Sequence, residues 1–214
     1  MTALGYSRYG AGGGDFGAGV ATFLALDHPE ALLGIHLTTP ELTPTGRDAS
    51  LTDEERAYLA VNRRWAEVER GYSSIQSTKP QTLGFGLNDS PAGLAAYLGE
   101  KWRSWSEVTP SDDFLCATFT LYWVTQTITS SMRDYWDNRR FPVEPTYVSS
   151  PTAFGVFAHE TIPEGVPPRK YLERLYNVQR YTTFPHGGHF APVEDPAAVA
   201  GDIRAFFCSA QRDS

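Results

Sequence analysis

Apolar residues in the first forty positions follow a pattern that predicts a strand, a helix and a second strand. Residues 9–13 have the length of a short strand and lead into a run of glycines. Residues 16–28 set apolar side chains among alanines, which indicates a helix packed along one face. Residues 32–39 (LLGIHLTT) are an apolar run that Pro40 ends, as is typical of a strand buried on both faces. This order predicts the βαβ unit of a parallel sheet.

The pattern then becomes helical, after a loop that the proline, threonine and glycine content predicts at residues 40–50. Residues 52–72 begin T-D-E-E, a capping box, and continue as a charged amphipathic helix. Ser90, followed directly by proline, caps a second helix. Ser111 caps a third helix, which is expected to run without a break to Tyr135. The middle of the chain is therefore expected to be helical throughout.

Strand-like segments return in the last third of the chain. Residues 146–156 predict a strand and a loop, and a polar, proline-rich loop is expected to continue to about residue 170. Residues 181–184 predict a strand that ends in P-H-G-G-H, and Asp195 with the next proline opens the last helix. The expected fold is α/β, with a mostly parallel sheet interrupted by a helical insertion.

These elements divide the chain into two expected units. Residues 1–45 and 141–214 form an α/β core, and residues 46–140 form a helical lid inserted into that core. Apolar residues make up 41% of the 214 residues, which is enough to bury a core of this kind.

Composition excludes some classes of partner. The net charge is −7 and lysine and arginine form no long run, which argues against nucleic acid as the partner. The first ten residues lack an apolar signal region, and no window has the length of a membrane span, so a cytoplasmic location is expected. Cys116 and Cys208 are expected to be buried or idle thiols, because two scattered cysteines make neither a metal signature nor a disulfide framework.

One carboxylate interrupts the glycines between the first strand and the first helix. Gly13-Gly14-Asp15-Phe16-Gly17 has the form G-x-D-x-G, the nucleophile-elbow layout with aspartate in place of serine. Small residues two positions before and after the aspartate would let the strand and the helix approach. The Phe16 amide would point at an anion formed beside Asp15. A glycine loop with a capping aspartate explains the same letters, so the motif alone leaves both interpretations open.

Two later residues fit as partners of Asp15. In an α/β-hydrolase triad the order along the chain is nucleophile, acid, histidine. His189 lies after the last strand and before the last helix, where the base is expected, and His186 is a competitor for that role. Glu160 follows the preceding strand, where the acid is expected, although a solvated loop glutamate explains it equally well.

A carboxylate nucleophile suits a particular chemistry. Aspartate is ionised at neutral pH, so Asp15 could open a strained carbon–oxygen bond or a carbon–halogen bond and form an ester. His189, oriented by Glu160, could then activate water against that ester. An epoxide leaves an alkoxide that needs a proton donor, whereas a halide needs weak donors such as an indole N–H.

Several stretches make the sequence specific. They are GGDFG at 13–17, TKPQTLGFGLNDSPAGLAAYLGEKW at 78–102, LYWVTQTITSSMRDY at 121–135 and GGHFAPVEDP at 187–196. Together they resemble the microsomal-type epoxide hydrolases of the α/β-hydrolase fold, and the similarity runs from residue 1 to the end. By that resemblance Asp15 is the nucleophile, His189 the general base and Glu160 its acidic partner. Tyr72 and Tyr135 would hydrogen-bond the epoxide oxygen and protonate the opening alkoxide.

The resemblance also bears on the pocket and on partners. Trp123 and Trp136 are expected to be lid packing or pocket wall. The implied substrates are a small-molecule epoxide and water, without a metal ion or an organic cofactor. Soluble members of the family serve detoxification as well as specialised metabolism, and the lid composition does not decide between them.

The family pattern continues upstream of the elbow, with an H-G-x-P loop and further strands and helices that this chain lacks. A mis-assigned start, a truncated gene and a second chain that supplies the missing half, such as a homodimer partner, remain alternatives. We expect weak or absent turnover from these 214 residues alone. The rival functions are a haloalkane dehalogenase and a non-catalytic remnant or interaction fragment.

Overall fold

In the described part of the chain, four parallel strands form one sheet, in the order β1-β2-β3-β4. The structure is a computed structural model and describes residues 1–44, 50–142, 144 and 146–210. The strands are β1 (Tyr9–Gly13), β2 (Leu32–Leu37), β3 (Val148–Phe157) and β4 (Tyr176–Phe184). Gly13 pairs with Leu37 and Leu37 with Phe154, so the carboxyl ends of the first three strands meet at one edge of the sheet.

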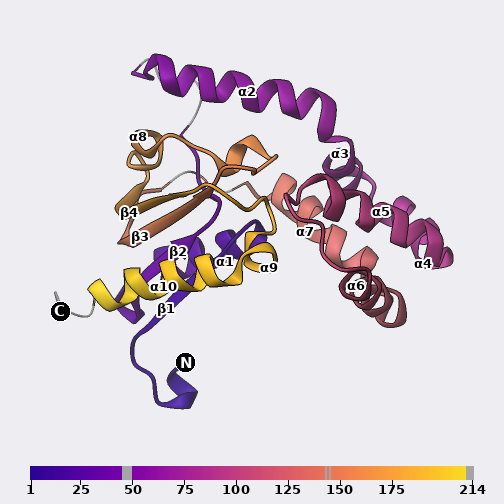
Figure 1. Cartoon of the computed structure of the whole chain (residues 1–214), viewed down its shortest axis with the longest axis horizontal. Coiled ribbons are helices and arrows are strands. Elements are labelled where there is room, and N and C mark those ends of the chain that lie inside the picture. The colour runs from indigo at the N-terminus through magenta and orange to yellow at the C-terminus, as the bar shows by residue number, and fades with distance from the viewer. Residues whose placement is uncertain (45–49, 143, 145, 211–214) are drawn as a thin grey trace.

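Helices cover the sheet on both faces (Figure 1). Helix α1 (Phe16–Asp27) packs alanines against β2 and β3 in the main apolar cluster. Helix α10 (Pro196–Ala210) lies on the other face, and a Cβ added at Gly34 would stand 2.9 Å from the Phe206 ring. Gly34 has φ +155°, and it lets α10 approach β2 closely. The short helices are η1 (Thr2–Leu4), η2 (Pro29–Ala31), η3 (Pro163–Gly165), α8 (Arg169–Leu172) and α9 (Ala191–Glu194).

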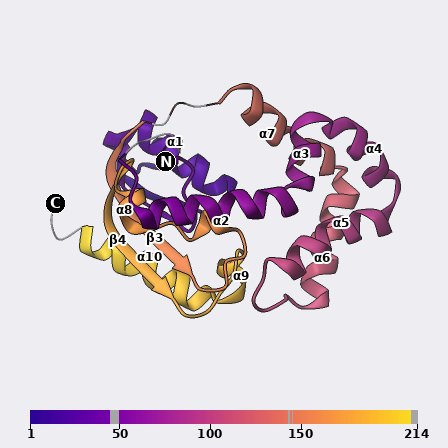
Figure 2. The same cartoon turned by 90° about the horizontal axis from the view of Figure 1, so that it is seen from above.

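Between β2 and β3 the described chain is helical. The helices are α2 (Asp53–Glu69), α3 (Gly71–Thr78), α4 (Pro80–Asp89), α5 (Pro91–Ser104), α6 (Asp112–Thr125) and α7 (Ile128–Arg140). Helices α3 to α7 group to one side of the sheet, and α2 runs from the sheet toward them (Figure 2). They have an apolar cluster of their own, made by Leu87, Leu94, Ile128 and Met132. We call α2 to α7 the helical segment.

The expected caps are confirmed. Thr52 Oγ1 accepts from Glu55 N–H, and a Glu55 carboxylate oxygen accepts from Thr52 N–H, which completes the capping box. Ser90 caps α5 and Ser111 caps α6, each by accepting a backbone N–H at the first turn.

Two expected boundaries are wrong. The helix after Ser111 does not run to Tyr135, because Gln126 adopts a left-handed conformation (φ 55°, ψ 35°) and separates α6 from α7. Gln126 is neither glycine nor proline, so the sequence carries no signal of that break. Strand β4 begins at Tyr176 rather than Tyr181, and its first half alternates buried with polar, more exposed positions.

Other expectations have mixed outcomes. Both cysteines, Cys116 and Cys208, are exposed rather than buried. Within the described ranges, every helix is too short or too polar to cross a lipid bilayer. Part of the loop expected at 40–50 and the division between residues 45 and 46 lie outside the described residues.

Candidate active site

Asp15 stands on the turn between β1 and α1, in a conformation that non-glycine residues rarely adopt (φ 50°, ψ −128°). Its Oδ1 accepts from Phe16 N–H at 2.7 Å, and its own N–H donates to Thr39 Oγ1 at 2.8 Å. A Cβ added at Gly13 would lie 2.4 Å from the Gly17 backbone, so glycine is required there. A Cβ added at Gly17 would have no atom within 4 Å. The expectation that both positions must be small is therefore correct for Gly13 and wrong for Gly17.

The loops after β3 and β4 carry Glu160 and His189, and His189 connects Glu160 to Asp15. His189 Nε2 lies 3.1 Å from Asp15 Oδ2, and His189 Nδ1 lies 3.1 Å from Glu160 Oε2. The other Glu160 oxygen accepts from the backbone N–H of Ile162 at 2.8 Å. The backbone N–H of His189 donates to the Trp105 carbonyl at 2.8 Å. The side chains of His189 and Glu160 are 7% and 4% exposed, whereas that of Asp15 is 43% exposed. The structure therefore places the three residues in a connected row that ends at an accessible carboxylate.

The charges in this row support one another. Burial by itself raises the pKa of Asp15, but hydrogen bonds from His189 and the Phe16 amide and the imidazolium charge hold it below its usual value. Burial lowers the pKa of His189, but its hydrogen bonds and charge interactions with Asp15 and Glu160 raise it to about 9. At neutral pH Asp15 is therefore a carboxylate and His189 an imidazolium.

Two phenols from the helical segment lie opposite Asp15. The rings of Tyr72 on α3 and Tyr135 on α7 are 6.0 Å apart between centroids, and Tyr135 meets Phe16 edge-on at 4.9 Å. Burial, followed by the charge of Asp15, raises the pKa of Tyr72. Burial, followed by Tyr72 and Asp15, raises the pKa of Tyr135. Both hydroxyls are therefore protonated donors at neutral pH.

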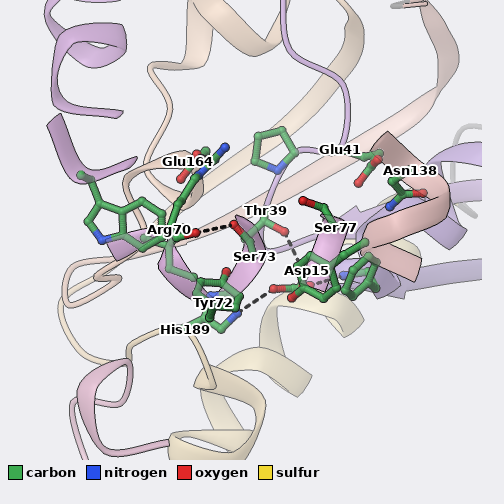
Figure 3. Close-up of a pocket in the computed structure, with 15 residues that line it drawn as sticks. Asp15, Thr39, Glu41, Arg70, Tyr72, Ser73, Ser77, Asn138, Glu164 and His189 are labelled. Atoms are coloured by element: carbon green, nitrogen blue, oxygen red, sulfur yellow. Dashed lines mark hydrogen bonds and ion pairs between the residues drawn. The ribbon is translucent and has the colours of Figure 1, made fainter. Parts of the chain in front are cut away.

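Asp15, Phe16, Tyr72 and Tyr135 adjoin two cavities, of about 350 and 420 Å³. Figure 3 shows the first of these, with Asp15 and His189 joined beside Tyr72. Polar side chains line the first cavity, among them Glu41, Arg70, Ser73, Ser77, Asn138 and Glu164. Aromatic and aliphatic side chains line most of the second, among them Leu98, Trp102, Trp105, Tyr122, Ile128 and Phe190.

Trp123 and Trp136 are expected to be lid packing or pocket wall, and the structure agrees with the first alternative. Trp123 packs on the apolar cluster of the helical segment, and Trp136 stacks with Arg140 beside a separate cavity near Pro80. Neither lines the two cavities that adjoin Asp15.

Sequence reasoning missed Thr39 and Trp105. Thr39 follows the strand next to the Asp15 turn, and the carboxyl ends of parallel strands are where site residues are expected. Trp105 holds His189 through a backbone carbonyl, which no side-chain pattern predicts.

Comparison with known proteins gives consistent matches. No protein-family model matches the chain. A putative epoxide hydrolase of Stigmatella aurantiaca (strain DW4/3-1) is 37% identical over an alignment of 215 positions, gaps included, that covers 97% of this chain and 48% of that protein. Epoxide hydrolase 1 of Sus scrofa is 34% identical over an alignment of 239 positions, gaps included, that covers 96% of this chain and 52% of that protein.

A solved structure agrees with these relatives. The juvenile hormone epoxide hydrolase of the silkworm Bombyx mori superposes with a TM-score of 0.87 at 29% identity, covering 99% of this chain and 57% of that chain. This match confirms the predicted α/β fold with a helical insertion. The chain spans about half the length of the curated relatives it matches. The chain is thus a homologue of the microsomal-type epoxide hydrolases and covers about half of the family's length, with the α/β-hydrolase fold of its structural neighbours.

Proposed function

We propose that Asp15, His189 and Glu160 form a hydrolytic triad that adds water to an epoxide and gives a vicinal diol. The observation that carries the proposal is the row of two 3.1 Å contacts from Glu160 through His189 to Asp15. That row ends at a cavity that both phenols also line. The chain spans about half the length of its relatives, and the proposed reaction rests on the residues that the chain itself supplies.

In the first step an oxygen of Asp15 bonds to an epoxide carbon, and the bond from that carbon to the epoxide oxygen breaks. The carboxylate is suited to this attack because its lowered pKa keeps it ionised. The electron pair of the broken bond stays on the epoxide oxygen, which takes a proton from Tyr72 or Tyr135. The product is an ester on Asp15 with a hydroxyl on the neighbouring carbon.

Ester formation changes the charge state of His189. The ester carries no negative charge, so one of the two carboxylates that raise the pKa of His189 is lost. His189 can then release its proton, by way of water, to the tyrosinate left by the first step. The neutral imidazole is the form that a general base needs.

In the second step His189 takes a proton from water, and the resulting hydroxide attacks the carboxyl carbon of the ester. The bond between that carbon and the alkyl oxygen breaks, and the leaving oxygen takes the proton of the hydroxyl that was added to the carboxyl carbon. The diol therefore leaves with an oxygen that belonged to Asp15, and Asp15 is again a carboxylate. The Phe16 amide, 2.7 Å from Asp15 Oδ1, is placed to stabilise the charge that develops on that oxygen. His189 is then again an imidazolium.

The test is the mass of the peptide that carries Asp15 after brief exposure of the folded chain to styrene oxide. We expect an adduct of one epoxide that accumulates in His189→Gln, because the ester then lacks the base that would hydrolyse it. Asp15→Ala should give no adduct, and His28→Gln, at an exposed histidine after α1, should behave as the unchanged chain. A folded His189→Gln variant without adduct would contradict the proposal.

A bromoalkane used in parallel separates the dehalogenase alternative. We expect the epoxide to react and the bromoalkane not to, because the phenols are proton donors to an alkoxide. The reverse preference would overturn the choice of epoxide while leaving Asp15 as nucleophile.

A further inference from the structure

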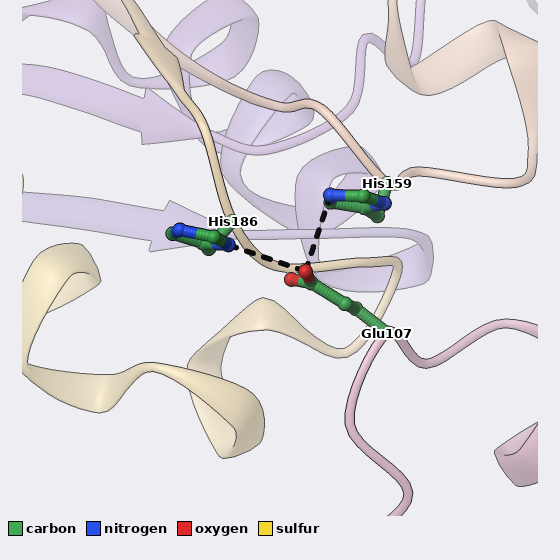
Figure 4. A group of neighbouring side chains, drawn as sticks. All are labelled: Glu107, His159 and His186. Atoms are coloured by element: carbon green, nitrogen blue, oxygen red, sulfur yellow. Dashed lines mark hydrogen bonds and ion pairs between the residues drawn. The ribbon is translucent and has the colours of Figure 1, made fainter.

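His186, the first histidine of the P-H-G-G-H run, is turned away from Asp15 and belongs to a second cluster. It lies with His159 and Glu107, and one ligand atom from each of the three lies within 4.8 Å of the others. Glu107 Oε1 is 3.1 Å from His159 Nε2 and 3.2 Å from His186 Nδ1. Figure 4 shows the carboxylate between the two rings.

Three segments that are far apart in sequence supply this cluster. Glu107 lies in the loop after α5, His159 follows β3, and His186 follows β4. The side chains of His159 and His186 are 50% and 74% exposed, and that of Glu107 is 23% exposed. An ion can therefore reach all three donor atoms from solvent.

The Glu107 carboxylate is held in place from its other side. Its Oε2 accepts from Gly187 N–H at 2.5 Å, which leaves Oε1 facing the two imidazoles. A backbone donor behind a carboxylate is the kind of outer contact that orients metal ligands in proteins. The carboxylate is thus fixed in the direction a shared ion would need.

We propose that Glu107, His159 and His186 bind a Zn²⁺ ion. Two imidazoles and one carboxylate are a donor set that zinc accepts, with water as the fourth ligand, whereas Mg²⁺ and Ca²⁺ favour oxygen donors. Zinc bonds of about 2.0–2.2 Å in a tetrahedron put ligand atoms about 3.3 Å apart. The two distances from Glu107 already lie near that value. The rings are nearly parallel, 8° apart, so binding needs a ring rotation that their exposure allows.

A bound ion would join the helical segment to the core beside the triad. His159 directly precedes Glu160, His186 stands three residues before His189, and Trp105 accepts the His189 N–H two residues before Glu107. Zinc would therefore cross-link the loop after α5 to both loops that carry the acid and the base. Because it binds the folded chain, it would also stabilise that state. This site is independent of whether the chain turns over an epoxide.

The test is calorimetric titration of Zn²⁺ into the chain with Cys116 and Cys208 changed to serine, because exposed thiols also bind zinc. We expect one ion per chain with micromolar affinity and a rise in Tm on adding Zn²⁺. His159→Gln and His186→Gln should each weaken binding by at least about tenfold, since even outer-shell changes have effects of that size. His28→Gln, a change at an exposed histidine beside Glu30, should leave the affinity unchanged.

Three outcomes overturn the proposal, provided that circular dichroism shows the variants folded. The first is no binding by the unchanged cluster at millimolar Zn²⁺. The second is binding that survives in both His159→Gln and His186→Gln. The third is binding that disappears in His189→Gln and in neither of the other two, which would place the ion at the triad.

Discussion

The imidazole–carboxylate contacts of His189 have a buried counterpart in the core of the fold, with different surroundings. At the carboxyl edge His189 joins Glu160 to Asp15, whose side chain is 43% exposed. Within the sheet His36 on β2 lies 2.7 Å from Asp202 on α10, and the two side chains are 3% and 2% exposed. Geometry of the pair alone therefore does not distinguish a reactive site from a structural one.

What differs is the solvent access of the carboxylate, which is 43% exposed in Asp15 and 2% exposed in Asp202. Asp202 Oδ2 meets His36, and its Oδ1 accepts from Arg180 Nε at 2.7 Å and from Thr182 Oγ1 at 2.8 Å. Protein donors thus occupy both Asp202 oxygens, and the group ties α10 to β2 and β4. Asp15 also has a protein partner on each oxygen, Phe16 N–H on Oδ1 and His189 on Oδ2, but it lies in a strained turn and faces a cavity. The two carboxylates therefore differ in access to solvent and not in the number of oxygens that are paired.

Asp15→Ala gives the largest expected effect and separates the two rows most clearly. Removing a covalent nucleophile should lower any epoxide turnover by about 10⁴-fold or more. Thermal stability should change only modestly, because the Asp15 side chain is 43% exposed and solvent screens its contact with His189. Measured turnover and Tm of the variant test both statements. A variant that keeps its activity would show that Asp15 is not the nucleophile.

Asp202→Ala should have the converse effect. It leaves His36 and Arg180 without a shared buried carboxylate, and breaking a buried charged pair typically costs about 3–5 kcal/mol. Denaturant unfolding should show that loss, with Arg204→Ala on the exposed side of α10 as the control, within about 0.5 kcal/mol of the unchanged chain. A loss below 1 kcal/mol would mean that the His36–Asp202 contact is not structural.

Much of the row formed by Asp15, His189 and Glu160 could be predicted from the sequence, whereas the buried His36–Asp202 pair could not. Asp15, Glu160 and His189 each follow a predicted strand, and parallel strands bring their carboxyl ends to one edge. His36 sits inside an apolar run and its partner is 166 positions away, so no local pattern links them. Tyr72 and Tyr135 were predicted only from the family resemblance. The periodicity of the sequence does not show that α3 packs against α7. The break at Gln126 was missed for want of glycine or proline.

Tyr135→Phe and Tyr72→Phe should have an intermediate effect. Each removes one proton donor to the alkoxide while keeping the ring, and general acids contribute about 10²-fold or more. The double variant should lose more than either alone, with little change in Tm. Tyr147→Phe, at an exposed ring before β3, is the matched control. Unaltered epoxide turnover in the double variant would remove the phenols from the mechanism.

The smallest expected effect is a difference in pH dependence. The pKa of His189 is raised to about 9, so its stabilisation is complete below about 6.5 and is lost as the pH rises through about 9. The pKa of Asp202 is lowered, because hydrogen bonds from His36, Arg180 and Thr182 outweigh burial. Its stabilisation is lost at the acid end instead. The two rows should therefore weaken at opposite ends of the pH range.

Tm measured against pH tests this contrast. His189→Gln should flatten the alkaline fall by about 2–4 °C, a modest effect because solvent screens the exposed Asp15. Asp202→Asn should flatten the acid fall and leave the alkaline one. Equal changes of Tm at alkaline pH in His189→Gln and Asp202→Asn would show that the two pairs do not weaken at opposite ends of the pH range.

In the proposed mechanism Asp15 forms an ester, and water attacks that ester at its carboxyl carbon. A single turnover in water labelled with the heavy oxygen isotope distinguishes this route, through the masses of the diol and of the peptide that carries Asp15. We expect the label in the Asp15 carboxylate and an unlabelled diol. Label in the diol, with none in Asp15, would contradict it, because water would then have attacked the epoxide directly.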